Sequence, residues 1–256
     1  MFPIVFIHLQ PRIGFPWTVR IMCFIQLACC LVALPLLFLG EAMPKPKNPR
    51  SLIHWNALAE LSFSCYGVAN FLMFMAYFIP LFYVPFFAIQ ALGTSLELGF
   101  SLLAVLNGAS AFGRIGSSLM SQKLGTSRLL LASVVISSVM LFGWIGVHNL
   151  AGFIVFCILF GLFSGVLISA NPVVIAHPVV SPTHSVYGTR LGMQWFATSL
   201  GVLVGAPIAG AIGADGSIEA FHKLQGFSGA VMAGGALFLL IPVTAIWRYD
   251  RQHRQW

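Results

Sequence analysis

The sequence predicts an all-α protein that crosses a membrane about seven times. Two observations predict this fold class. First, 59% of its 256 residues are hydrophobic and only 7% are charged, whereas a soluble domain carries about 25% charged residues. Second, the apolar residues gather in runs of about 20, the length that a helix needs to cross the hydrocarbon core of a bilayer. We therefore expect the lipid bilayer to be a partner of this chain.

Seven runs have this length. They cover residues 17–39, 66–89, 98–121, 129–147, 151–175, 191–213 and 227–247. The second run contains Pro80 and Pro85, which should kink or break its outer half because proline removes a backbone donor. The expected parts of the chain are an extracytoplasmic stub at 1–16, a lone helix at 17–39, a cytoplasmic linker at 40–64, a six-helix bundle at 65–248 and a cytoplasmic tail at 249–256.

The linker starts with a polar, proline-rich stretch, EAMPKPKNPRS, which begins at Glu41. Its second part, LIHWNALAEL at 52–61, has two alternatives. It forms either a short amphipathic helix at the inner membrane interface or a plain connector. The sequence alone leaves both open.

The basic residues indicate the orientation, because cytoplasmic loops of membrane proteins are enriched in Lys and Arg. If the linker is cytoplasmic, ten of the thirteen basic residues lie on that side. They are Lys45, Lys47, Arg50, Arg114, Lys123, Arg128, Arg190, Arg248, Arg251 and Arg254. The N-terminus is then outside and the C-terminus inside, and we expect the plasma membrane rather than an internal membrane.

Small residues recur at every fourth position in three of the predicted helices. Such faces let helix backbones approach closely, which replaces the hydrophobic driving force that is absent in lipid. The three sets are Ala109, Gly113, Ser117 and Ser121; then Gly161, Gly165 and Ser169; then Gly201, Gly205, Ala209 and Gly213. Three such faces in one chain indicate a tightly packed bundle.

Arg114 is the only charged residue between positions 98 and 121. An arginine in the middle of a membrane helix costs at least about 2.5 kcal/mol, so it usually faces a bundle interior or a wet cavity. Ser110 and Ser118 share its helix face, with Asn107 two turns back. The guanidinium fork suits a carboxylate or another anion. The alternative is that Arg114 snorkels to the cytoplasmic interface.

Other polar residues give weaker predictions. Tyr83 and Asn171 are candidates to line a cavity, although Asn171 with Pro172 also suits a helix end. Arg190, at the start of a predicted helix, either belongs to an entry cap or gates the inner mouth. We expect no metal site, no cofactor and no nucleic-acid partner. Enzyme motifs such as GxSxG, HExxH and Walker A are absent, so no catalytic residue is predicted.

Several stretches together resemble a known family. LNGASAFGRIGSSLMSQKLG at 106–125 is similar to the eighth helix and following turn of the major facilitator superfamily, specifically of fungal monocarboxylate-transporter-like proteins. PRIGFPWTVR, FIPLFYVPFFAIQALG and VYGTRLGMQWFATSLGVLVGAPIAGAI are similar to its sixth, seventh and eleventh helices. The resemblance implies the C-terminal six-helix half of that fold, preceded by one helix.

The resemblance also implies site residues. It places Arg114 where related carriers bind a substrate carboxylate, and it places an inner gating turn from Gly113 to Gly125. The chain departs from the family at three positions. Gln122 and Lys123 stand for an Asp and an Arg in the turn, and Ser110 stands for an Asp one turn before the arginine. These departures leave the family's charge relay and proton coupling unsupported here.

We therefore expect a transporter of a small organic anion or secondary metabolite. Because carriers of this kind have twelve helices in two halves, the resemblance to helices 6–12 leads us to expect a truncated form. Such a form would pair with a second half-transporter chain or as a homodimer. The alternative is a non-transporting membrane remnant or a partner subunit of another transporter chain.

Overall fold

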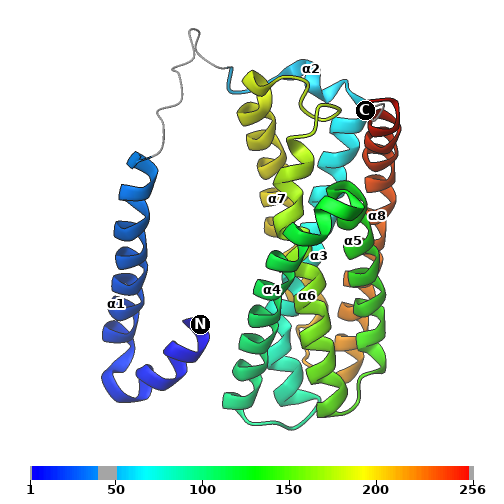
Figure 1. The fold of residues 1–256 in the computed structure, drawn as a ribbon. Helices are drawn as coiled ribbons and strands as arrows, with labels where there is room; N and C mark the ends of the chain where they lie inside the picture. Colours follow the sequence, from blue (N-terminus) through cyan, green and yellow to red (C-terminus); the bar gives the residue numbers. More distant parts are fainter. Residues whose placement is uncertain (1, 40–50, 254–256) are drawn as a thin grey trace. The chain divides into compact units, whose positions relative to one another are not determined.

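A computed structural model of the chain describes residues 2–39 and 51–253. It divides the chain into two units, Met1–Arg50 and Ser51–Trp256. Within the described residues, seven helices are long and apolar enough to cross a membrane (Figure 1). The predicted all-α membrane class is therefore confirmed.

The described part of the first unit is α1 (Phe2–Leu39), which consists of two helical segments that meet at a kink at Gly14. Gly14 has a φ of 74°, a left-handed conformation that glycine adopts without steric cost. Thr18 bridges the kink, since its hydroxyl donates to the Gly14 carbonyl at 2.8 Å. The segment 1–16, expected as a stub, is thus helical from Phe2 onward.

The second unit is a bundle of six long helices and one short one. They are α2 (Trp55–Leu58), α3 (Leu61–Gln90), α4 (Leu96–Leu124), α5 (Thr126–Gly143), α6 (Leu150–Ile175), α7 (His184–Ile212) and α8 (Ile218–His253), with a 3-10 turn at Trp144–Gly146. The long helices alternate in direction (Figure 1). One end of the bundle holds α2, the α4–α5 turn and the end of α8; we name it the α2 end, and the opposite end the far end.

The helix bounds differ from the predicted ones at several ends. α3 begins at Leu61 rather than 66, and α8 continues to His253, through most of the expected tail. α3 also runs as one helix through Pro80 and Pro85, so of the expected kink or break the break does not occur. α6 continues past Pro172 to Ile175 and then ends. In the linker's second part, Trp55–Leu58 form a single helical turn, and Leu61 already begins α3.

The bundle contains two sets of three consecutive long helices, α3–α5 and α6–α8, and the two sets are interleaved. α3 packs chiefly against α7 and α8, the last two helices of the second set. α6 packs chiefly against α4 and α5, the last two helices of the first set. α5 and α8 then pack against each other. The first helix of each set thus packs against the other set, and this packing joins both sets into one unit.

The predicted small-residue faces are confirmed as contacts between helix backbones. A Cβ atom on Gly161 or Gly165 of α6 would overlap the backbone carbonyls of Leu106 or Ser110 on α4. The face on α7 does the same against α3. There, Gly201 and Gly205 lie against the backbones of Phe71 and Met75. These two pairs, α4–α6 and α3–α7, are the closest packed seams that the glycines reveal.

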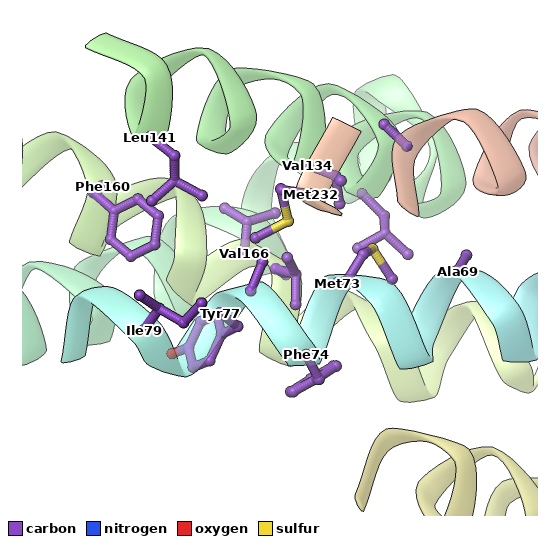
Figure 2. Close-up of a cluster of buried hydrophobic side chains, with 14 of the residues drawn as sticks. Ala69, Met73, Phe74, Tyr77, Ile79, Val134, Leu141, Phe160, Val166 and Met232 are labelled. Atoms are coloured by element: carbon purple, nitrogen blue, oxygen red, sulfur yellow. The ribbon is translucent and has the colours of Figure 1, made fainter. Parts of the chain in front are cut away.

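The core lies where α3, α5, α6 and α8 meet. Ala69 and Met73 of α3 point toward Met232 of α8 and Val134 of α5 (Figure 2). Phe74, together with Tyr77 one turn later, lies on the side of α3 that is turned away from α5 (Figure 2). α3 therefore serves both as core and as a wall facing α7.

Gly165→Ala should lower the thermal stability of the bundle, because its methyl group would overlap the Ser110 carbonyl and push α4 away from α6. Overpacking of this kind costs about 1–3 kcal/mol. We expect the melting temperature in detergent micelles, followed by circular dichroism, to fall by several degrees. Gly210→Ala is the matched control, since a Cβ there meets no atom within 4 Å. Equal melting temperatures for both variants would contradict the close contact.

Candidate functional site

Arg114 lies in the middle of α4 with an exposed side chain. Its neighbour Gly113 is buried, and a Cβ there would overlap the Leu162 carbonyl of α6. This contact fixes the rotation of α4 and therefore the direction of Arg114. The ion pairs found among the described residues do not include Arg114. Its charge is thus available to an anion.

Tyr77 of α3 lies next to Arg114 and is only 3% exposed. Ser110 of α4 and Ser164 of α6 border the same tyrosine. The Ser110 hydroxyl is buried and has no hydrogen-bond partner among the described residues. A buried hydroxyl without a partner is costly, and Tyr77 is the polar side chain that borders it. The site therefore places a cation, a phenol and two serine hydroxyls near one another.

The rest of the predicted polar strip on α4 behaves differently from Ser110. Asn107 is exposed and donates to the Leu103 carbonyl of its own helix at 2.9 Å. Ser118 is also exposed and donates to the Arg114 carbonyl at 3.2 Å. Both residues face the same open side as Arg114. Their side chains line the approach to Arg114 without bonding to another helix.

Asn171 of α6 lies in a buried hydrogen-bond network nearer to the α2 end. The Tyr66 hydroxyl donates to its side-chain oxygen at 2.8 Å, and its amide donates to Asn70. Asn70 in turn donates to Gln194 of α7 at 3.2 Å, and Gln194 donates to the Phe63 carbonyl at 3.0 Å. All four polar side chains are at most 3% exposed. The network fastens α3, α6 and α7 together.

Arg190 of α7 is 1% exposed and forms a double contact with Glu60, just before α3. Its Nη1 donates to a Glu60 oxygen at 2.6 Å, and its Nη2 donates to the other. Nη1 also donates to the Val180 carbonyl in the α6–α7 loop. The guanidinium further lies 5.2 Å from the Phe63 ring, a cation–π distance. Arg190 therefore locks α7 to the start of α3.

The hydrogen bond from Arg190 holds the pKa of the Glu60 carboxyl below its ordinary value, although partial burial opposes the shift. The positive charge of Arg190 and, to a smaller extent, His54 act in the same direction as the hydrogen bond. Glu60 thus stays ionised well below neutral pH. The ion pair persists across the physiological range.

Tyr83 lies toward the far end of α3 and is half-buried. It lines a cavity of about 480 Å³ with Gln90 of α3 and Asp215 after α7. Asp215 accepts a hydrogen bond from the Ser217 hydroxyl at 3.1 Å. The far end therefore carries a mainly apolar cavity with a few polar side chains, and its lining does not include Arg114.

The predicted gating turn joins α4 to α5. Gln122 and Lys123 are exposed in the last turn of α4. Gly125 follows with a φ of 82°, which ends α4 and starts α5. The Arg128 guanidinium lies over this glycine, since a Cβ there would meet it at 3.4 Å. The turn is thus built from a left-handed glycine and basic side chains.

The candidate residues lie at three levels along α3. A helix rises about 1.5 Å per residue, so Tyr77 lies about 16 Å and Tyr83 about 25 Å beyond Tyr66. Asn171 bonds to Tyr66 at the first level, and Arg114 borders Tyr77 at the second. The predicted binding residues therefore do not form one cluster. In the described part of the chain, no three His, Cys, Asp or Glu side chains gather as a metal site would require.

Comparison with known protein families shows which family this chain belongs to. The family model of the Major Facilitator Superfamily matches residues 2–189, more than half of the chain. The chain belongs to the Major Facilitator Superfamily. The curated relatives that it matches include fungal transporters.

The MFS-type transporter dbaD of Emericella nidulans is 33% identical over 212 residues, which cover 83% of this chain and 47% of dbaD. The MFS-type transporter opdF of Penicillium oxalicum is 34% identical over 242 residues, 93% of this chain and 55% of opdF. The aspyridones efflux protein apdF of Emericella nidulans is 33% identical over 229 residues, 90% of this chain and 45% of apdF. The chain spans about half the length of these relatives.

The structure reveals residues at or near the candidate site that the sequence analysis missed. Tyr77 borders Arg114, and Glu60 pairs with Arg190. Tyr66 and Asn70 join the network around Asn171. A signal existed for Glu60, since it is one of only six acidic residues and precedes an apolar run. No signal in the sequence distinguishes Tyr77 from the other aromatic residues of α3.

Glu60→Gln should destabilise the chain at pH 7, because it leaves the buried Arg190 guanidinium without its counter-charge. We expect a fall of several degrees in melting temperature in detergent. The folded-state pKa of Glu60 is lowered, so its stabilising contribution is present above the unfolded pKa of about 4.3 and is lost as the pH falls below it. The difference between wild type and variant should therefore shrink toward acidic pH.

Glu219→Gln is the matched control for this measurement. Glu219 pairs with Lys223 at 2.8 Å, but both side chains are exposed, 77% and 65% respectively. Exposed pairs contribute little to stability. We expect no more than a small shift from Glu219→Gln. If both variants melted alike, or if the Glu60→Gln difference were constant with pH, the role of the Arg190 contact would be refuted.

Proposed function

We propose that this chain takes part in moving a small organic anion or secondary metabolite across the membrane, as part of a monocarboxylate-like transporter of the superfamily. Arg114 binds the anionic group of the substrate. One observation carries this proposal: the guanidinium of Arg114 has no carboxylate partner among the described residues and lies next to the phenol of Tyr77. A cation placed at such cost in a membrane helix marks a substrate or ion pathway.

The relatives support a transporter rather than an enzyme. Two of them are named MFS-type transporters, and a third is named an aspyridones efflux protein. The substrate is thus of the size of a secondary metabolite or a simpler organic acid. The basic residues at the α2 end support a cytoplasmic location for that end. The plasma membrane is the membrane we propose for it.

The remaining predicted residues take secondary roles in this proposal. Asn107 lies on the open side of α4 and adds a polar contact near Arg114. Asn171 positions α6 through its buried bonds, and Tyr83 lines a separate far-end cavity. Arg190 and the Gly125 turn form the inner gate region at the α2 end. Gly113 sets the direction of Arg114.

A second candidate function is that of a non-transporting partner of another membrane chain. The exposed apolar side chains of α4 and α7 favour it. Phe112, Ile115, Leu119, Phe196 and Leu203 are each at least 65% exposed. These surfaces suit lipid, a second half-transporter chain or a second copy of this chain. Co-purification of a differently tagged copy tests the homodimer.

Arg114→Ala should abolish flux of organic anions in liposomes that contain the purified chain. The variant removes the only charge in the central part of α4, so bound anions lose their counter-charge. Uptake of radiolabelled benzoate and pyruvate measures the effect. We expect flux to fall to that of protein-free liposomes, with unchanged insertion of the protein.

Lys223→Ala is the control, since it removes an exposed cation at the far end. Its flux should equal that of the wild type. If Arg114→Ala transported anions at the wild-type rate, the proposed role of Arg114 in binding the substrate would be refuted. Absence of flux in the wild type, for both acids, would favour the partner function over transport.

A further inference from the structure

A second feature of the bundle adjoins Phe74 and Phe78, the two rings that contact Tyr77. It is a cavity of about 480 Å³ between α3, α6 and α7. Its walls include Phe74 and Phe78 of α3, Ile168 of α6, and Trp195 and Val202 of α7. Cavities of this size hold small organic ligands. We name it the aromatic cavity.

Three aromatic rings line this cavity, and a fourth, that of Tyr77, borders two of them. The Phe74 ring centroid lies 6.2 Å from that of Trp195 across α3 and α7. Tyr77 lies 5.6 Å from Phe74 and 5.0 Å from Phe78, edge-on to the latter. Trp195 is 43% exposed, so its ring is open to a ligand. Aromatic surfaces from two helices thus face one space.

Tyr77 connects this cavity to the cation. Its ring contacts the rings of Phe74 and Phe78, and the same side chain lies next to Arg114 and Ser110. Figure 2 shows Phe74 and Tyr77 on the same side of α3, turned away from the core residue Met73. A single ligand that spans Tyr77 would therefore meet aromatic carbon at one end and positive charge at the other.

The geometry points to an organic acid with a flat aromatic or conjugated body as the occupant. The body lies against Phe74, Phe78 and Trp195, and the anionic group meets Arg114. Charge complementarity selects an anion over a neutral compound. Ring surfaces favour a flat body over a flexible alkyl chain, because aromatic pairs are worth more than their buried area alone. This inference rests on the proposed function for the role of Arg114 and narrows its substrate class.

The test measures binding to the full chain in detergent micelles with three probes. 2-Naphthoate is flat and anionic, octanoate is flexible and anionic, and 2-naphthalenemethanol is flat and neutral. We expect the wild type to bind 2-naphthoate about tenfold more tightly than either of the others, which corresponds to about 1.4 kcal/mol. Isothermal titration calorimetry gives the three dissociation constants.

Two variants separate the two ends of the site. Trp195→Ala should weaken 2-naphthoate binding about tenfold and leave octanoate unchanged, since it removes ring surface only. Arg114→Gln should remove the preference for 2-naphthoate over the neutral alcohol. Phe196→Ala is the matched control on the same helix, because Phe196 lines a different groove, with Trp55 and Leu58. Its dissociation constants should equal those of the wild type.

Each outcome decides between the alternatives. Equal binding of 2-naphthoate and octanoate, both weakened by Trp195→Ala, would overturn the aromatic preference and show a site for acyl chains. If Trp195→Ala loses all binding and also has a lowered melting temperature, Trp195→Phe replaces it in the measurement. Trp195→Phe keeps a ring at this position and should retain 2-naphthoate binding. Failure of Trp195→Phe to bind 2-naphthoate would also overturn the inference. Selective binding without flux in liposomes would instead reject the proposed function and leave the site intact.

Discussion

The close backbone contact between α4 and α6 is the constraint on which the central part of the bundle depends. Apolar side chains gain little by leaving lipid for protein, so helices in a membrane associate through tight packing. Gly161 and Gly165 allow α6 to meet the backbone of α4, and Gly113 allows the reverse contact with Leu162. α4 cannot rotate about its axis without overlap at these positions. That restriction holds Arg114 beside Tyr77.

Polar groups inside the bundle divide into two kinds by their partners. The network of Tyr66, Asn70, Asn171 and Gln194 uses its donors and acceptors internally, as lipid-embedded polar groups require. These residues stabilise the association of three helices. Arg114 lacks a carboxylate partner within the described residues, and the nearby hydroxyl of Ser110 lacks any. The polar side chains at the first level are therefore paired with one another, whereas Arg114 at the next level receives no counter-charge from the described residues.

The sequence predicted the helices and their packing faces but not the side-chain pairs. Apolar runs and four-residue spacing are local features of the sequence. The helices and packing faces predicted from them agree with the structure except at the helix ends. Arg114 could be identified from the sequence alone, because a single charged residue in an apolar run is recognisable without knowledge of its neighbours in space. Glu60 and Arg190 are 130 positions apart, and their pairing depends on how α3 and α7 pack. Tyr77 became significant for the same reason, since its neighbours come from α4 and α6.

α3 is the element that joins these levels, because one unbroken helix carries Tyr66, Tyr77 and Tyr83. Its α2 end is fixed to α7 through Glu60 and Arg190. Its middle lies against α7 through the glycine seam and borders the aromatic cavity. The aromatic cavity and the Glu60–Arg190 ion pair thus lie along the same pair of helices, α3 and α7. The ion pair and the glycine contacts together hold the two helices that supply most of the cavity wall.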